Sequence, residues 1–234
     1  MSPKPQNARA FIALITAAGV ASICFGLAQT NSWHPYQALA LCGIAAVASR
    51  MKIKLPGLAG NMSVNLPFLL IAVAELNLVE ALVVAGVSAA VQCFPSDGRK
   101  TRPEQMLFNV SSMAFATALA WWVFQQGAGS AWFVPMATVL FFLGQTVPVS
   151  IIISLTTGDT LAKIWTSMAR LTFPYFVLSA GVAAMMTSAS RQVGWQIPLG
   201  ALPVMFGVFC SYQTYFLTAI APEKSAAMSA SAAH

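Results

Sequence analysis

The chain has 234 residues, of which 58% are hydrophobic and only 8% are charged, and its formal net charge is +6. A soluble domain usually carries about a quarter of charged residues, so this composition excludes a water-soluble protein and leaves little chain for a second domain. Apolar segments of roughly twenty residues, enough to cross a hydrocarbon core about 30 Å thick, recur along the sequence. We therefore predict an all-α fold, a polytopic transmembrane helix bundle.

Eight segments are predicted to span the membrane, within a bundle that covers residues 10–221. In chain order they are 10–29, 36–50, 66–76, 78–94, 104–124, 132–155, 171–189 and 196–221. The third and fourth are short and meet at Glu75 to Glu80, which indicates a tight helical hairpin. A seven-span alternative needs one of this pair to be re-entrant. Residues 1–9 and an Ala- and Ser-rich tail at 222–234, too short to fold and expected to be disordered, flank the bundle.

The positive charges favour eight spans. With a cytoplasmic N-terminus, every Lys and Arg except Arg191 falls on one side of the membrane, and basic residues near helix ends are retained in the cytoplasm. A single span over 66–94 would instead place Arg99, Lys100 and Arg102 outside. We therefore expect a multi-pass protein of a bacterial inner membrane with both termini cytoplasmic. The tryptophans agree, because all but Trp165 then lie near the outer interface.

The first span could also be a cleaved secretory signal. Its apolar run is longer than the 7 to 15 residues usual for a signal peptide, so an uncleaved helix is expected. Cleavage would leave seven spans and an external N-terminus.

Two connecting segments carry local signals. Thr101 and Glu104, three residues apart with Pro103 between them, are typical of a capping box and predict the start of the fifth helix. Residues 160–170 place apolar side chains at helical spacing opposite Lys163 and Arg170. This pattern predicts a short connecting helix in the inner headgroup layer.

The sequence contains no signature of catalysis or of metal binding. Its four cysteines are scattered without a Cys-x-x-Cys pair, and no phosphate-binding glycine motif, Gly-x-Ser-x-Gly elbow or carboxylate pair within one span is present. We expect no enzyme activity, no catalytic residue, no metal, no cofactor and no nucleic-acid partner. His34, in a turn at the outer interface, could sense pH, but a turn residue without such a role is expected.

Polar residues within the spans are the candidates for a ligand-binding site, because such residues are costly in hydrocarbon and tend to face a cavity. They are Asn65, Gln92, Asn109, Ser112 and Gln145. The irregular stretch Leu55 to Gly60 and Pro148 point to the same region. The hypothesis is a pocket bounded by residues 57–65, Asn109 and Gln145. The alternative is that these amides join helices, at about 0.6 to 2 kcal/mol each.

Several short motifs suggest a relationship. They are Leu55-Pro56-Gly57, Met62-Ser63-Val64-Asn65-Leu66-Pro67-Phe68, Val91-Gln92-Cys93-Phe94, Phe108-Asn109-Val110-Ser111-Ser112-Met113-Ala114 and Phe173-Pro174-Tyr175-Phe176. With these motifs the chain resembles, over residues 10–221, the membrane region of bacterial HD-GYP and GGDEF signalling proteins. The resemblance implies a sensor whose last helix leads to a cytoplasmic cyclic di-GMP domain. No such domain follows residue 221, so we expect a sensor-like or ligand-binding module that acts through a separate cytoplasmic signalling or coupling protein.

Two alternatives remain open. The charge-poor bundle also resembles, more faintly, the substrate-binding subunits of energy-coupling-factor vitamin transporters, although its polar residues are predicted toward the cytoplasm rather than the outer face. A structural or assembly protein without a ligand explains the missing chemistry equally well. In every case the lipid bilayer is a partner.

Overall fold

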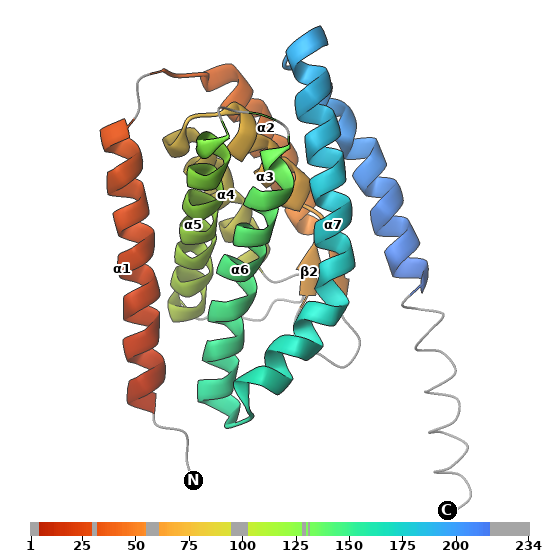
Figure 1. Cartoon of the computed structure of the whole chain (residues 1–234). Coiled ribbons are helices and arrows are strands. Elements are labelled where there is room, and N and C mark those ends of the chain that lie inside the picture. Colours follow the sequence, from red (N-terminus) through yellow and green to blue (C-terminus); the bar gives the residue numbers. More distant parts are fainter. Residues whose placement is uncertain are drawn as a thin grey trace, which may run out of the picture.

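Helices run back and forth through one bundle in the computed structural model, which describes residues 5–29, 32–54, 61–94, 103–127, 130 and 132–215 (Figure 1). They are α1 (Pro5–Gln29), α2 (Pro35–Arg50), α3 (Leu66–Glu75), α4 (Leu78–Cys93), α5 (Pro103–Gln126), α6 (Phe133–Thr157), α7 (Leu161–Val193) and a final helix, Ile197–Tyr215, whose first turn is the 3-10 helix η1 (Ile197–Gly200). The predicted all-α bundle with a short helical hairpin is confirmed.

Five of the described helices are long and apolar enough to cross a membrane, namely Gln6–Gln29 in α1, α5, α6, α7 and the final helix. The central one is α5, which packs against α1, α4 and α6. On α6, a Cβ atom built on Gly144 would lie 2.9 Å from the Cβ of Ala116 in α5. A Cβ on Gly19 of α1 would lie 2.9 Å from the Cα of Ser111. Glycine therefore lets α5 approach both neighbours closely.

The hairpin of α3 and α4 lies inside the bundle. Every residue from Leu66 to Val73 is buried, as expected for a helix that is apolar on all sides. Asn77 ends the turn and begins α4 through a capping box: its side chain accepts from the N–H of Glu80 at 2.9 Å, and Glu80 Oε2 accepts from the N–H of Asn77 at 3.3 Å. Trp121 of α5 donates to the carbonyl of Leu76 at 3.2 Å and fixes the turn from the side.

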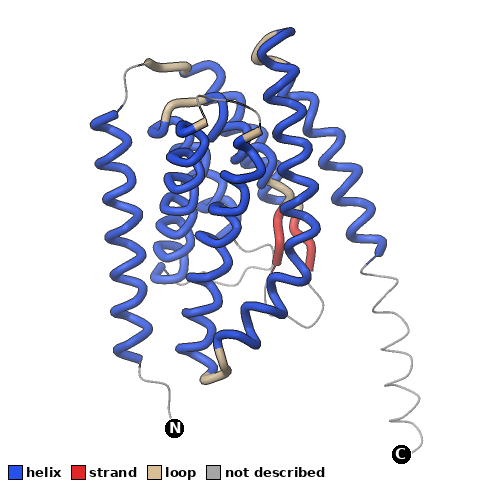
Figure 2. Tube along the Cα trace, in the orientation of Figure 1, coloured by secondary structure: helices blue, strands red, loops and turns tan. Residues whose placement is uncertain are grey.

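A two-stranded β-hairpin, which was not predicted, precedes α3. Strand β1 (Lys52–Lys54) pairs antiparallel with β2 (Asn61–Ser63), with Ile53 opposite Met62. Since α3 has 10 residues and α5 has 24, α3 is about 15 Å long beside a helix of about 36 Å. The strands, three residues each and so about 10 Å long, lie below α3 and take up part of the remaining depth (Figure 2). The irregular stretch Leu55 to Gly60 between them lies outside the described residues.

One prediction was wrong at α7. Residues 160–170 were expected to form a separate connecting helix before the seventh span, but α7 runs without interruption through 33 residues. No glycine or proline separates the two parts before Pro174, so nothing ends the helix at Arg170. Proline removes a backbone hydrogen bond and bends a helix, and the first turns of α7 run obliquely in Figure 1 while the rest stands upright.

The described positive charges mark one end of the bundle. Here α1, α5 and α7 begin and α2 ends, bringing Arg9, Arg50, Lys52, Lys163 and Arg170 to the lower end in Figure 1. We call this the basic end. Arg191 lies at the opposite end, in the last turn of α7. Five of the predicted charges, Lys4, Arg99, Lys100, Arg102 and Lys224, lie outside the described residues, as does Thr101 of the predicted capping box, although α5 does begin at Pro103.

Candidate functional site

A chain of hydrogen bonds joins four elements inside the bundle. From β2, Ser63 Oγ accepts from Gln92 Nε2 of α4 and donates to Asn65 Oδ1 at 2.8 Å. The Asn65 amide then donates to Ser88 Oγ of α4. Ser88 and Ser49 of α2 are joined at 2.6 Å between their hydroxyl oxygens. Two of the five predicted site residues, Asn65 and Gln92, are thus brought together, through serines that the prediction did not include.

The direction of each bond can be assigned from the donors available. Ser49 Oγ donates to the carbonyl of Ala45 at 2.6 Å, so Ser88 must donate to Ser49. In this series of hydrogen bonds from Gln92 to Ala45, each serine hydroxyl then donates its hydrogen to one acceptor. Ser49 and Ser88 are 0% exposed and Asn65 is 4% exposed, and a buried polar atom without a partner would be costly. The chain is therefore a fully satisfied network that holds the start of α3 against α2 and α4.

Lys52 extends this network to the basic end. Its Nζ donates to the backbone carbonyls of Gln92 at 2.7 Å and Phe94 at 3.1 Å. These carbonyls belong to the last turn of α4, which has no later helical N–H to bind and carries the negative end of the helix dipole. A lysine on β1 thus caps α4 and ties the β-hairpin to it.

Tyr175 anchors the same region from α7. Its buried hydroxyl oxygen accepts from the N–H of Leu66 at 3.2 Å. The neighbouring Phe176 packs edge-on against Phe142 of α6, with ring centroids 4.9 Å apart. The motif Phe173 to Phe176 therefore connects α6 and α7 to the first turn of α3.

The other three predicted residues lie on α5 and α6, and the described contacts do not join them to the serine and amide network. Asn109 donates to Cys93 Sγ at 3.5 Å, a weak contact with the last residue of α4. Ser112 is 1% exposed, and its hydroxyl has no partner among the described residues. The same holds for the buried Nε2 of Gln145. Ser112 stands one turn before Ala116 in α5, and Gln145 follows Gly144 in α6, so both are near the level at which these two helices approach closely.

The predicted set therefore divides into two parts with different chemistry. Asn65 and Gln92 have protein partners, which fits the alternative in which amides join helices. The hydroxyl of Ser112 and Nε2 of Gln145 have no partner among the described residues and remain able to form hydrogen bonds with a ligand. Sequence reasoning missed Ser49, Ser63, Ser88 and Tyr175. One signal was present for Ser88, because it stands four residues before Gln92 and so shares its helix face.

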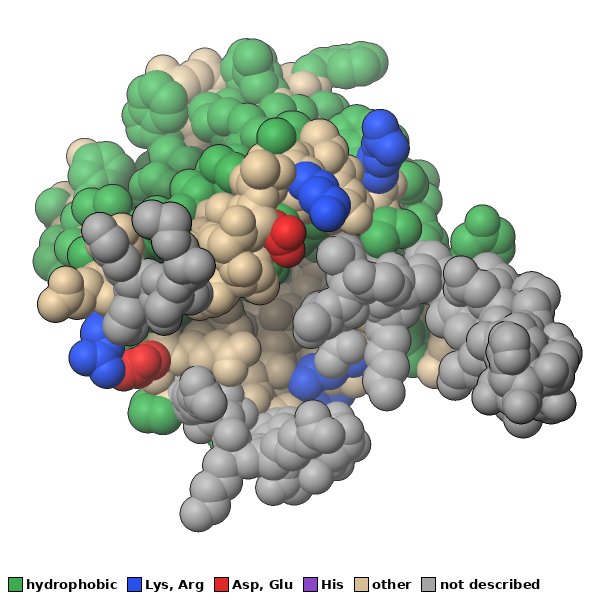
Figure 3. All heavy atoms as spheres, turned by 90° about the horizontal axis from the view of Figure 1, so that it is seen from below, with side chains coloured by type: hydrophobic (Ala, Val, Ile, Leu, Met, Phe, Trp, Pro, Cys, Tyr) green, Lys and Arg blue, Asp and Glu red, His purple; other side chains and the backbone are tan. Residues whose placement is uncertain are grey.

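A recessed area is visible at the basic end when the molecule is viewed from below (Figure 3). Polar and backbone atoms form the visible floor of this recess, and Lys and Arg side chains lie near its rim. Hydrophobic side chains dominate the flanks of the molecule in the same view. The visible middle of this face is thus formed by polar side chains and backbone, and its flanks are hydrophobic.

At the opposite end, the two acidic residues of the hairpin serve as anchors for α2. Glu80 Oε1 accepts from the N–H of His34 at 2.5 Å, and Glu80 Oε2 lies 3.7 Å from His34 Nδ1. Glu75 Oε2 accepts from Gln37 Nε2 at 2.6 Å. His34 thus has a carboxylate partner, and its imidazole forms an ion pair when protonated. That His34 is a turn residue without a role in pH sensing stays a prediction.

No group of three or more His, Cys, Asp or Glu side chains that could hold a metal occurs within the described ranges. Among known families, the model of the MASE9 family, a family of membrane-associated sensory domains, matches residues 14–216. No curated protein and no solved structure matches the chain. The match spans α1 to the final helix and includes both parts of the predicted site.

Proposed function

Because the chain belongs to the MASE9 family of membrane-associated sensory domains, we propose that it is a sensor that binds a ligand inside the bundle and has no catalytic activity of its own. The observation that carries this proposal concerns two of the five buried side-chain atoms that have no partner among the described residues, Ser112 Oγ of α5 and Gln145 Nε2 of α6, which lie near the close approach of these helices. A buried polar group without a partner costs about 1–3 kcal/mol. A ligand that bonds to these groups would recover that cost.

The available chemistry limits the ligand class. Gln145 offers an amide donor and Ser112 a hydroxyl, while Asn109 stands in the same helix as Ser112 with only a weak sulfur contact. The one described ammonium in this region, that of Lys52, is already bound to two carbonyls. We propose a small, uncharged molecule with hydrogen-bond acceptors, which would enter from the basic end.

Ligand binding on α5 would reach the serine and amide network through the contact of Asn109 with Cys93, the residue next to Gln92 at the end of α4, and the network would pass the change to α7. Asn65 precedes Leu66, whose N–H is held by Tyr175, and Tyr175 follows Pro174 at the bend of α7. Pro174, Arg170 and Leu171 form one side of a groove of about 450 Å³, whose other side is Ser211, Tyr212 and Tyr215 of the final helix. A shift of α3 would therefore reach the contact between α7 and the final helix.

The final helix would carry the signal out of the membrane. It descends to the basic end in Figure 1, which the positive-inside rule assigns to the cytoplasm of a bacterial inner membrane. Both chain ends would then be cytoplasmic. A separate cytoplasmic signalling or coupling protein that contacts the end of this helix is the partner that we propose.

Native mass spectrometry of protein extracted gently from its own membrane tests the ligand. The wild-type chain should retain a small molecule that the double variant Asn109→Ala, Gln145→Leu loses. Thr138→Val is the matched control, because Thr138 is a buried polar residue of α6 whose hydroxyl binds the carbonyl of Val134 within its own helix. This control should keep the small molecule.

The free energy of unfolding of the ligand-free protein distinguishes a ligand-binding role of Gln145 from a role in packing the helices together. Replacing an unpartnered amide by an apolar side chain of similar size removes a desolvation cost, so Gln145→Leu should leave the free energy of unfolding unchanged or raise it by about 1 kcal/mol. Recovery of the wild-type chain with lipid alone, under conditions shown to preserve weak complexes, would favour a structural role for the bundle.

A further inference from the structure

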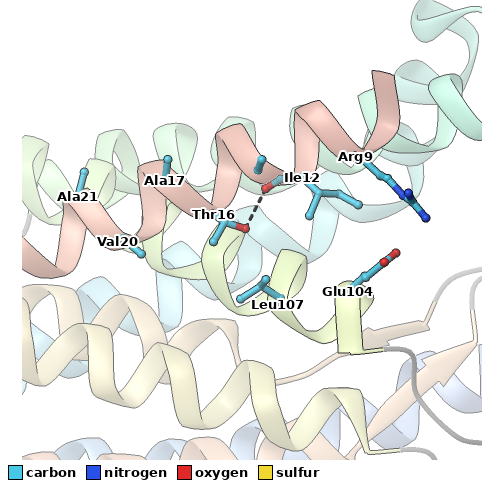
Figure 4. A pocket seen from close by; sticks show the side chains of 9 residues that line it. Arg9, Ile12, Thr16, Ala17, Val20, Ala21, Glu104 and Leu107 are labelled. Carbon is cyan, nitrogen blue, oxygen red and sulfur yellow. Dashed lines mark hydrogen bonds between the residues drawn. The ribbon is translucent and has the colours of Figure 1, made fainter. Parts of the chain in front are cut away.

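An open apolar groove of about 720 Å³ runs along α1 and α5, away from the proposed ligand site. Its walls are Ile12, Ala13, Thr16, Ala17, Val20 and Ala21 of α1, together with Leu107 of α5. The hydroxyl of Thr16 donates to the carbonyl of Ile12 at 2.8 Å (Figure 4), so it adds no free polar group to the wall. The small alanine side chains on α1 leave the groove open.

Two opposite charges stand at one end of this groove. Figure 4 shows the guanidinium of Arg9 on α1 and the carboxylate of Glu104 on α5 facing each other across the gap between the helices. The described ion pairs do not include one between them. Both side chains are exposed. The mouth of the groove therefore presents a cation and an anion side by side, each with hydrogen-bonding capacity to spare.

The length of the groove fits one leaflet of a membrane. From Arg9 to Ala21, α1 rises about 18 Å, and half of a hydrocarbon core is about 15 Å. Arg9 lies at the basic end, the level expected for lipid headgroups, so Ala21 lies near the middle of the bilayer. An acyl chain that follows α1 would thus be covered by the groove from its headgroup to its end.

We propose that this groove binds a phospholipid whose headgroup carries both a phosphate and a primary ammonium. Arg9 would bind the phosphate, since guanidinium groups form charge-assisted bonds with phosphate oxygens. Glu104 would accept from the ammonium, which has three N–H donors. An anionic headgroup without an amine would bring like charge against Glu104, and a quaternary ammonium has no N–H to donate. The charge pattern therefore favours an aminophospholipid.

Competition between lipids tests this assignment. The purified protein is incubated in detergent with equal amounts of phosphatidylethanolamine, phosphatidylcholine and phosphatidylglycerol with identical acyl chains, and bound lipid is counted by native mass spectrometry. Phosphatidylethanolamine should be retained about two- to fivefold more than either competitor, the range for one exposed charge-assisted contact, because the phosphate that Arg9 binds is common to all three lipids. Glu104→Gln should abolish its advantage over phosphatidylglycerol, whereas Arg9→Gln should lower the retention of all three.

Matched controls separate the groove from general charge effects. Arg50→Gln and Asp159→Asn make the same charge changes at exposed positions away from the groove walls and should leave the lipid ratios unchanged. Ala17→Phe should fill the groove and reduce lipid retention with both charges intact, whereas Ala28→Phe, an exposed position of α1 beyond the groove, should not. Equal retention of the three lipids by the wild type, or equal effects of Glu104→Gln and Asp159→Asn, would overturn the proposal.

Discussion

The backbone N–H of Leu66 lies in the first turn of α3, where no carbonyl of the same helix can accept its hydrogen bond. The following residue is Pro67, which has no N–H, and Asn65 uses its own side chain for Ser63 and Ser88. Tyr175, which is 109 residues away in the chain, supplies the missing acceptor. A single buried hydroxyl thus decides where a buried helix can start.

Removal of this hydroxyl should be costly. Tyr175→Phe keeps the ring and its packing but leaves the Leu66 N–H unpaired in a buried place, so we expect the free energy of unfolding to fall by about 1–3 kcal/mol. Titration of the solubilised protein with a denaturing detergent, followed by circular dichroism, measures this change. Tyr36→Phe, at a residue 82% exposed, should have no measurable effect. Equal effects of the two variants would contradict the role of the hydroxyl.

At the scale of elements, the close approach of α6 to α5 depends on the absence of a side chain at Gly144. A Cβ there would lie 2.9 Å from the Cβ and 3.0 Å from the Cα of Ala116, and the latter is a backbone atom that cannot turn aside. Van der Waals packing between small residues is a main force that holds helices together in lipid.

Gly144→Ala should therefore destabilise the bundle. We expect a loss of about 1–3 kcal/mol in the free energy of unfolding, because overpacking outweighs the better helix propensity of alanine. Gly181→Ala is the matched control in α7, since a Cβ at Gly181 would meet nothing within 4 Å. In Gly181→Ala only the better helix propensity of alanine acts, and it should raise the free energy of unfolding by at most about 1 kcal/mol. A variant at Gly144 as stable as wild type would show that α5 and α6 can separate without cost.

For the whole molecule, the separation of charge between its ends predicts its orientation in the membrane. Among the described Lys and Arg side chains, Arg191 alone belongs to the end opposite the basic end. Basic residues near helix ends are retained in the cytoplasm. The recess and the mouth of the lipid groove, both at the basic end, would then face the cytoplasm and its leaflet.

Labelling of single cysteines tests this orientation. In a protein whose four cysteines have been replaced, Val193→Cys, at an exposed position after Arg191, should react with a membrane-impermeant maleimide on intact cells. Asp159→Cys, in the exposed connection between α6 and α7, should react only after the cells are permeabilised. The reverse pattern would place the basic end outside and contradict the positive-inside argument for this chain.

Part of the candidate site could be predicted and part could not. Asn65, Gln92, Asn109, Ser112 and Gln145 were found because amides and hydroxyls within apolar segments are conspicuous in any sequence. Their partners were not found, because a serine among alanines, such as Ser88, carries little signal by itself. The bonds from Asn65 to Ser88 and from Ser49 to Ser88 join residues 23 and 39 positions apart. Such pairs depend on how helices pack, which no local pattern encodes.

The sequence by itself determined the membrane class, the approximate position of the helices other than α7, the hairpin at Glu75 to Glu80 and the asymmetry of charge. These follow from hydropathy, span length and the order of charges, which are properties of consecutive residues. Only the tertiary structure decided that α7 is continuous, that a β-hairpin precedes α3, and that Tyr175 meets Leu66. It also showed that Asn65 and Gln92 bond to serines, whereas the Ser112 hydroxyl and Gln145 Nε2 have no partner among the described residues. The physical reason is that hydrogen bonds and close helix contacts join residues distant in the chain, and their geometry exists only after the helices have packed.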